Sequence, residues 1–342
     1  MGLDVTMGGQ RRPAPDGRVE VVLEKSIYER RLVLFSGKGG VGKTTAASAF
    51  ALSCALQGQR TLLIELNVKD RLSSLFGAVE VGEEITEIEH NLWAVNTTPK
   101  AALREYAMMV LRVKFVYKAV FENPVIASFL RVIPGLNELV MLGKAWYHTV
   151  EEDDRGRFVW DKVVVDAPAT GHGIFFMKIP SVITSIIKAG PMYQEARKIE
   201  KLLQDPETTA LCLVTLPEEM PVNETLMFRE VVHKELKVPI GAIIANCVYP
   251  TGIDPKDMPW VLEANETIEG DTTAEAMVQA AAFRAKRVNM QSDYLKVLDE
   301  RTDEPMVQVP YYFTERFNFQ TIRKIADNLI TQLPGPDQGG AL

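Results

Sequence analysis

Residues 37–44 constrain this chain more than any other part of its sequence. They read GKGGVGKT and fit the pattern G-x-x-x-x-G-K-[ST]. An apolar run, residues 31–36, comes directly before them, and a helix-forming run, residues 45–50, comes directly after them. The sequence therefore predicts a strand, a glycine-rich loop and a helix in succession, an arrangement that is typical of loops that wrap around a phosphate group.

The residue types in this loop suit a nucleotide. Glycines let consecutive backbone N–H groups turn inward on an anion, and the helix that follows adds a partial positive charge at its N-terminus. Lys43 can reach the β- and γ-phosphates, and the hydroxyl of Thr44 can bind Mg²⁺. We therefore expect ATP and Mg²⁺ to bind at Gly37, Lys38, Gly39, Gly40, Val41, Gly42, Lys43, Thr44 and Thr45.

A second lysine lies inside the loop. Lys38 comes one residue after the first glycine. It cannot easily fold back onto phosphates that its own loop already surrounds, so we expect it to reach a nucleotide in a facing subunit. A cation supplied in this way can accelerate phosphoryl transfer by roughly 10³- to 10⁵-fold.

Short apolar runs alternate with helical stretches along the chain. The runs are nearly continuous rather than alternating, which is typical of strands buried on both faces of a parallel sheet. They cover residues 31–36, 61–66, 92–96, 162–166, 210–216, 239–246 and 305–309. Helical stretches such as 44–57 and 221–236 separate them. The pattern predicts an α/β fold, a doubly wound and mainly parallel sheet of the P-loop NTPase type.

One region departs from this alternation. Between residue 99 and about residue 205 only one strand is evident, and the rest is apolar and helical. We predict a helical subdomain at about 99–155 and 174–205, inserted into an ATPase domain spanning 31–333, with flexible tails at 1–30 and 334–342. Residues 101–120 carry two apolar stripes, so that helix either lies deep in a core or offers one face to a hydrophobic partner.

A second nucleotide signal follows the apolar residues 163–165. Asp166 ends this run, where a Walker B aspartate would hold Mg²⁺. The segment it begins reads DAPATGH. Together with KGGVGKTT in the loop, this segment resembles the arsenite-pump ATPase family, whose eukaryotic branch targets tail-anchored membrane proteins. The family reads DTAPTGH here, and Asp166, Thr170, Gly171 and His172 coincide with it.

The resemblance implies a dimerising P-loop ATPase in which Thr170, Gly171 and His172 sense the γ-phosphate and drive a conformational switch. It extends to IPGLNE at residues 133–138 and covers roughly residues 31–330. Asn246 matches the family's adenine-contacting asparagine, whose amide can pair with both a donor and an acceptor on the base. Pro310 matches a loop that lies over the base.

The sequence departs from the family at one catalytic position. Asn67 stands where the family has an aspartate that positions the attacking water. An amide can orient water but cannot accept its proton as a carboxylate does. We therefore expect slow hydrolysis, with Asn67 and Asp70 in a switch segment and with either Glu65 or Asp70 able to supply the missing carboxylate.

The composition of the chain limits which partners and ligands it can bind. The 342 residues include 38 Lys and Arg and 45 Asp and Glu, a net charge of −7, which argues against a protein that chiefly binds nucleic acid. No run of 18 apolar residues exists, and the N-terminus lacks the apolar stretch of a secretory signal, so we expect a cytoplasmic protein without a membrane span. Cys54, Cys212 and Cys247 are not clustered, which disfavours both an arsenite site and a zinc site.

Two functions from different classes remain open. The first is an ATP-hydrolysing homodimer, or a heterodimer with a paralogue, whose nucleotide state opens and closes a site for a hydrophobic protein segment. The second is an ATP-bound switch or scaffold that hydrolyses little, because Asn67 replaces the aspartate. A metalloid-efflux ATPase is a third reading, which the positions of the cysteines disfavour.

Overall fold

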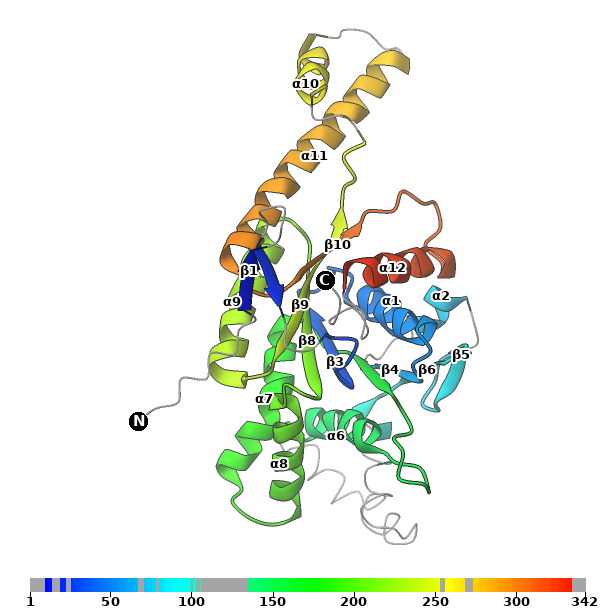
Figure 1. Ribbon diagram of the computed structural model, residues 1–342, viewed down its shortest axis with the longest axis vertical. Helices are drawn as coiled ribbons and strands as arrows, with labels where there is room; N and C mark the ends of the chain where they lie inside the picture. The colour runs from blue at the N-terminus through cyan, green and yellow to red at the C-terminus, as the bar shows by residue number, and fades with distance from the viewer. Residues whose placement is uncertain are drawn as a thin grey trace, which may run out of the picture.

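An eight-stranded sheet runs through the middle of the protein (Figure 1). The computed structural model describes residues 10–13, 19–22, 26–66, 71–77, 80–99, 101–102, 105, 135–252, 256–267 and 273–333. The strands of the sheet are β3 (Leu32–Gly37), β4 (Thr61–Glu65), β5 (Thr86–Glu89), β6 (Leu92–Asn96), β7 (Lys162–Asp166), β8 (Thr209–Thr215), β9 (Ile240–Val248) and β10 (Met306–Pro310). Their order is β10-β9-β8-β3-β7-β4-β6-β5, and every neighbouring pair is parallel except β5 with β6.

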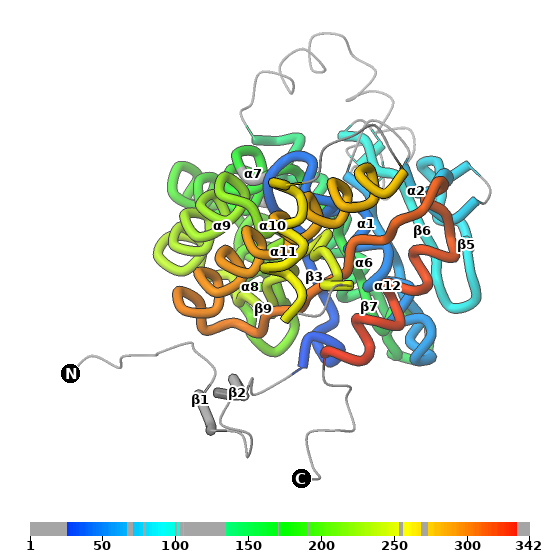
Figure 2. Tube along the Cα trace, turned by 90° about the horizontal axis from the view of Figure 1, so that it is seen from above, coloured from blue at the N-terminus to red at the C-terminus, as the bar shows by residue number. Residues whose placement is uncertain are grey.

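Helices cover both faces of this sheet (Figure 2). On one face lie α1 (Lys43–Leu56), α2 (Leu72–Phe76) and α12 (Phe319–Gln332). On the other lie α6 (Leu136–Val150), α7 (Thr170–Ile186), α8 (Pro191–Gln204) and α9 (Glu219–Val231), which continues into a single π-helical turn, η1 (Val232–Leu236). The sheet is therefore buried on both sides.

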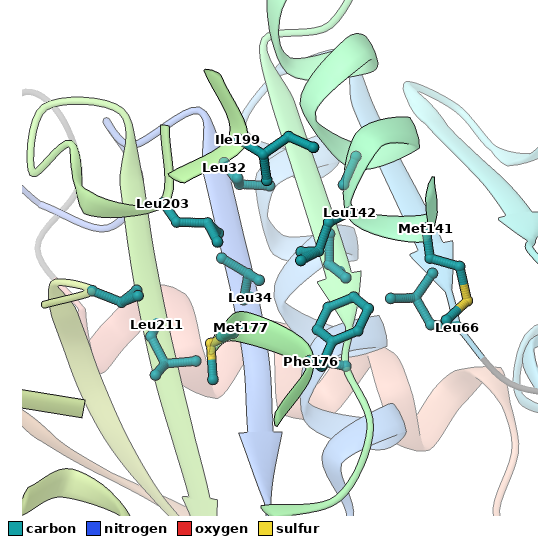
Figure 3. Packing of buried hydrophobic residues seen from close by; sticks show 14 of the residues in the cluster. Leu32, Leu34, Leu66, Met141, Leu142, Phe176, Met177, Ile199, Leu203 and Leu211 are labelled. Carbon is teal, nitrogen blue, oxygen red and sulfur yellow. The ribbon is translucent and has the colours of Figure 1, made fainter. Parts of the chain in front are cut away.

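The alternation of side chains along each strand builds two apolar layers. Leu32 and Leu34 of β3 pack toward α6–α8, whereas Val33 and Phe35 pack toward α1 and α12. Figure 3 shows Leu34 in the first layer, beside Met177 of α7. Because both faces of the inner strands must be apolar, these strands have the near-continuous apolar sequences from which they were predicted.

The predicted α/β fold is confirmed, and the strands lie within about two residues of their predicted bounds. The sequence does not reveal β5, whose residues TEIE are mostly polar. Within residues 1–30, predicted as a tail, the structure has an antiparallel pair, β1 (Gln10–Pro13) and β2 (Val19–Val22). Ile27 and Tyr28 in the same segment are fully buried.

Lys162 joins this segment to the sheet. Its side chain is 1% exposed, and Nζ donates hydrogen bonds to the carbonyl oxygens of Ile27 at 3.2 Å and of Tyr28 at 2.9 Å, and also to that of Arg30. A buried ammonium is tolerated only where oxygen atoms replace its water. The three carbonyl groups meet that need, which fixes residues 27–30 against β7.

Two further helices form a projection that the sequence does not predict. α10 (Met258–Thr267) packs against α11 (Thr273–Arg301), which rises away from the sheet at the top of Figure 1. At 29 residues α11 is about 44 Å long. None of the described helices has the length and hydropathy of a membrane-spanning helix.

α6 and α8 fall within the residues predicted as a helical subdomain, and α7 begins four residues before the second of its two ranges. Most of residues 103–134 lie outside the described residues, and with them most of the two apolar stripes of residues 101–120. The choice between a core helix and a partner-binding helix therefore stays a prediction for that stretch.

Candidate nucleotide site

The predicted phosphate loop connects the end of β3 to the start of α1. A Cβ atom at Gly37 would lie 2.1 Å from the carbonyl oxygen of Val214 in β8. Gly42 has a φ of +91°, and a Cβ atom there would lie 2.2 Å from Nδ2 of Asn246. Only glycine fits at these two positions, so the neighbouring strands β8 and β9 fix the path of the loop.

The structure brings Thr44, in the first turn of α1, into contact with Asp166, the last residue of β7. Thr44 Oγ1 donates a hydrogen bond of 2.6 Å to Asp166 Oδ2. The Asp166 side chain is 1% exposed, and its Oδ1 has no hydrogen-bond partner among the described residues. Burial raises the pKa of Asp166, while the hydrogen bond from Thr44 and the charge of Lys43 oppose that rise.

These two side chains fit Mg²⁺. The ion prefers hard oxygen ligands and usually binds through one or two protein oxygens together with phosphate oxygens and water. A buried carboxylate oxygen without a donor, beside a hydroxyl, supplies such ligands. Elsewhere in the part of the chain that the structure describes, no group of three or more His, Cys, Asp or Glu side chains is placed to hold a metal ion.

The two lysines of the loop make different contacts. Lys43 Nζ donates to the carbonyl oxygen of Lys38 at 3.0 Å, and burial lowers the pKa of Lys43. Lys38 Nζ lies 2.5 Å from Oε1 of Glu224 in α9. In the single chain, Lys38 is thus directed to a carboxylate of its own protomer.

A pocket of about 410 Å³ adjoins the loop. Its walls include Gly40, Val41, Gly42, Thr45, Asn246 and Pro310, all predicted from the sequence. Tyr249 and Tyr311 line it as well, with stacked rings whose centroids are 4.8 Å apart. Flat aromatic surfaces beside a phosphate loop suit a nucleotide base.

Asn246 joins this pocket to the loop. Its side chain is 7% exposed, and Nδ2 donates a hydrogen bond of 2.9 Å to the carbonyl oxygen of Val41. Among the described residues, no hydrogen bond reaches its Oδ1. Oδ1 can therefore accept a hydrogen bond from a base, and the second N–H of Nδ2 can still donate one.

The predicted switch segment passes beside β3 and leads into α7. Ala167 N donates to the carbonyl oxygen of Phe35 at 3.0 Å, and Ser36 Oγ donates to that of Pro168 at 3.2 Å. α7 begins at Thr170, and Gly171 and His172 are exposed at its first turn. No hydrogen bond between His172 and the loop is found in the described ranges. Asn67 and Asp70 lie outside the described residues.

Sequence reasoning missed several charged residues around the site. Arg71, just before α2, acts electrostatically on both Lys43 and Asp166. Arg287 of α11 donates to Glu218 Oε1 at 2.8 Å in the wall of the pocket. These contacts, like that of Lys38 with Glu224, join residues far apart in the chain, so no local pattern could have indicated them.

Comparisons with known proteins identify the family of this chain. The ArsA ATPase family model, described as "anion-transporting ATPase", matches residues 30–191 and 185–271. ATPase BagA of Mycobacterium tuberculosis is 30% identical over 277 residues, covering 79% of this chain and 78% of BagA. A Halobacterium salinarum protein, provisionally named an arsenical pump-driving ATPase, is 27% identical over 326 residues, covering 90% of this chain and 46% of that protein.

A similarly named protein of Aquifex aeolicus is 22% identical over 349 residues, which cover 90% of this chain and 80% of the relative. The family model spans most of the chain, including the phosphate loop, Asp166 and Asn246. This chain belongs to the ArsA ATPase family.

Proposed function

We propose that the protein binds ATP with Mg²⁺ and hydrolyses it, and that it works as a dimer. Membership of an ATPase family supports the reaction. The observation that carries the proposal is the hydrogen-bonded pair of Thr44 and Asp166 beside the glycine loop, in which Asp166 Oδ1 has no hydrogen-bond partner among the described residues. Turnover by the wild type, compared with Asp166→Asn, tests it through multiple-turnover phosphate release.

Each residue of the site has a role in this reaction. The backbone N–H groups of the loop and the ammonium of Lys43 bind the phosphates and orient them for in-line attack. Thr44 and Asp166 would hold Mg²⁺, which when bound neutralises charge on the β- and γ-phosphates. The pocket lined by Tyr249 and Tyr311 would hold the base.

Lys38 is proposed to act on the nucleotide of the facing subunit. Its side chain is 25% exposed, so it can leave Glu224 without disturbing the core. On dimer formation, Lys38 would leave Glu224 of its own chain and bind a phosphate of the nucleotide in the facing subunit. The facing subunit is a second copy of this chain or a paralogue.

Glu224→Gln is expected to favour the ATP-dependent dimer, because it removes the competing partner of Lys38. A partly exposed ion pair is worth up to about 1 kcal/mol, so the dimer dissociation constant should fall by up to about fivefold. Sedimentation velocity with ATP and Mg²⁺ measures it. Glu235→Gln is the matched control, because Glu235 also pairs with a lysine, Lys178, at 2.5 Å. Equal dissociation constants for both variants would contradict the role of Glu224.

Asn246 is proposed to select adenine. Nδ2 donates one of its two N–H groups to Val41, which orients the amide, and Oδ1 can accept from the 6-amino group of adenine. The 6-oxo group of guanine offers Oδ1 no donor. Asn246→Ala is expected to reduce the preference for ATP over GTP by about fivefold, because a hydrogen bond of this kind is worth about 1 kcal/mol. Competition binding gives this ratio, and any general weakening of the site cancels in it. An unchanged ratio would show that another group reads the base.

The helical subdomain is proposed to respond to the nucleotide and to bind a hydrophobic protein segment. α7 supports this, because it begins in the switch segment and carries the exposed side chains Phe175 and Ile186. A change at the γ-phosphate could thus reach an apolar surface through one helix. The alternative of a weakly hydrolysing scaffold is favoured by Asn67, and the rate of phosphate release separates the two.

A metalloid substrate is not proposed, although two relatives carry the name of arsenical pump-driving ATPases. Soft metalloids bind thiolates. Cys54 and Cys212 are fully buried, and burial raises the pKa of Cys54 to about 12 and that of Cys212 still further. These two thiols stay protonated and inaccessible at neutral pH.

A further inference from the structure

Glu65 is the last residue of β4, at the carboxyl end of the parallel strands, where the phosphate loop also lies. Strand β4 pairs with β7 in parallel, and in that register Glu65 is the partner of Asp166. Neighbouring strands are about 4.8 Å apart. Glu65 therefore lies directly beside the carboxylate that would hold Mg²⁺, on the side away from β3.

Both carboxylates point to the same face of the sheet. In β4, Leu62 and Ile64 pack toward α6–α8, whereas Leu63 packs toward α1. In β7, Val164 likewise packs toward α1. Because side chains alternate along a strand, Glu65 shares the α1 face with Leu63, and Asp166 shares it with Val164. This is the face where Thr44 contacts Asp166.

The surroundings of Glu65 connect it to the charges of the site. Its side chain is fully buried, and the backbone N–H of Arg71 donates to Oε2 at 3.3 Å. Arg71 also acts electrostatically on Asp166 and Lys43. Burying a carboxylate costs free energy of desolvation, whereas burying an apolar side chain at the same position would not. The position of Glu65 among these charged residues therefore indicates a role in the reaction rather than in stabilising the core.

We propose that Glu65 is a catalytic residue that orients the attacking water and accepts its proton. This rests on the proposed ATPase function. The water oxygen forms a bond to the γ-phosphorus, the bond from that phosphorus to the β–γ bridging oxygen breaks, and the electron pair leaves with ADP. The proton lost by the water passes to the carboxylate of Glu65, which returns it to the phosphate product or to solvent.

This role explains how a chain with Asn67 can hydrolyse ATP. Glu65 and Asn67 are two positions apart, at the end of the same strand and in the segment that follows it. A carboxylate on the strand would perform the proton transfer that an amide at Asn67 cannot perform. The site would then have its general base at the end of β4.

Glu65→Gln tests the proposal with an isosteric change. We expect the turnover number to fall by about 100-fold or more, the usual contribution of a general base, while the dissociation constant for ATP changes less than about twofold. Phosphate release measures the first quantity, and titration with a fluorescent ATP analogue without Mg²⁺ measures the second. The double variant Glu65→Gln with Asn67→Asp should recover at least tenfold, because it restores the carboxylate that the family has at this position of the sequence.

The outcomes are distinguishable. If the wild type binds ATP but releases no phosphate, the ATPase function itself fails. If the wild type turns over and Glu65→Gln turns over equally, the proposal for Glu65 is wrong. If Glu65→Gln loses ATP affinity or thermal stability in proportion to activity, or if Asn67→Asp gives no recovery, Glu65 is structural and the proposal is overturned.

Discussion

Lys38→Ala is expected to lower ATP turnover by about 10³-fold, the lower end of what a cation supplied by a facing subunit contributes. ATP binding to the single chain should change little, because Lys38 is directed to Glu224 rather than to its own phosphate loop. The ATP-dependent dimer should weaken as well. Phosphate release, ATP titration and sedimentation velocity measure these three quantities on the same samples.

Lys38→Arg is the control, since it keeps a cation that can reach the same phosphate. It should retain more activity than Lys38→Ala. If Lys38→Ala turned over and dimerised like the wild type, the proposed action across the dimer would be wrong, and Lys38 would only pair with Glu224.

Gly37→Ala is expected to destabilise the folded protein by about 3 kcal/mol, near the upper end of the usual cost of forcing an atom into a packed interior. The added Cβ atom would lie 2.1 Å from the carbonyl oxygen of Val214, and this oxygen belongs to the backbone of β8, so it cannot swing away. The loop or the strand must shift instead. Urea unfolding without nucleotide measures the change.

Gly39→Ala is a matched control in the same loop. A Cβ atom at Gly39 meets nothing within 4 Å, and that residue does not have a positive φ. Its stability should therefore stay within about 0.5 kcal/mol of the wild type. If the two variants lost equal stability, the contact of Gly37 with Val214 would not explain why glycine stands there.

The fold could be predicted wherever burial leaves a simple pattern. Strands such as β7 and β8 are buried on both faces, so their residues form apolar runs that stand out from the helices between them. α11 gives no such signal. It buries only Ala282, Ala285, Gln291 and Leu298 along its length, so its apolar periodicity is weak. The strand β5 lies at the edge of the sheet, where little of it is buried, so its residues are mostly polar.

The candidate site could be predicted as far as it is local in sequence. The glycine loop, with Lys43 and Thr44, forms one continuous segment of the sequence. Asp166 ends an apolar run, as a Walker B aspartate does. The pairing of Lys38 with Glu224 depends on the path of α9, which the sequence does not specify. Glu65 is one of two carboxylates that the sequence offers, and the structure places it in register with Asp166, whereas Asp70 lies outside the described residues.

Calorimetric titration of the purified protein with ATP and Mg²⁺ tests the nucleotide site most directly. Saturable binding near one nucleotide per chain is expected for the wild type, with affinity lost in Lys43→Ala because the ammonium beside the phosphates is removed. Absence of any heat of binding across several temperatures, or equal affinity in Lys43→Ala, would contradict the assignment of residues 37–44 as a phosphate-binding loop.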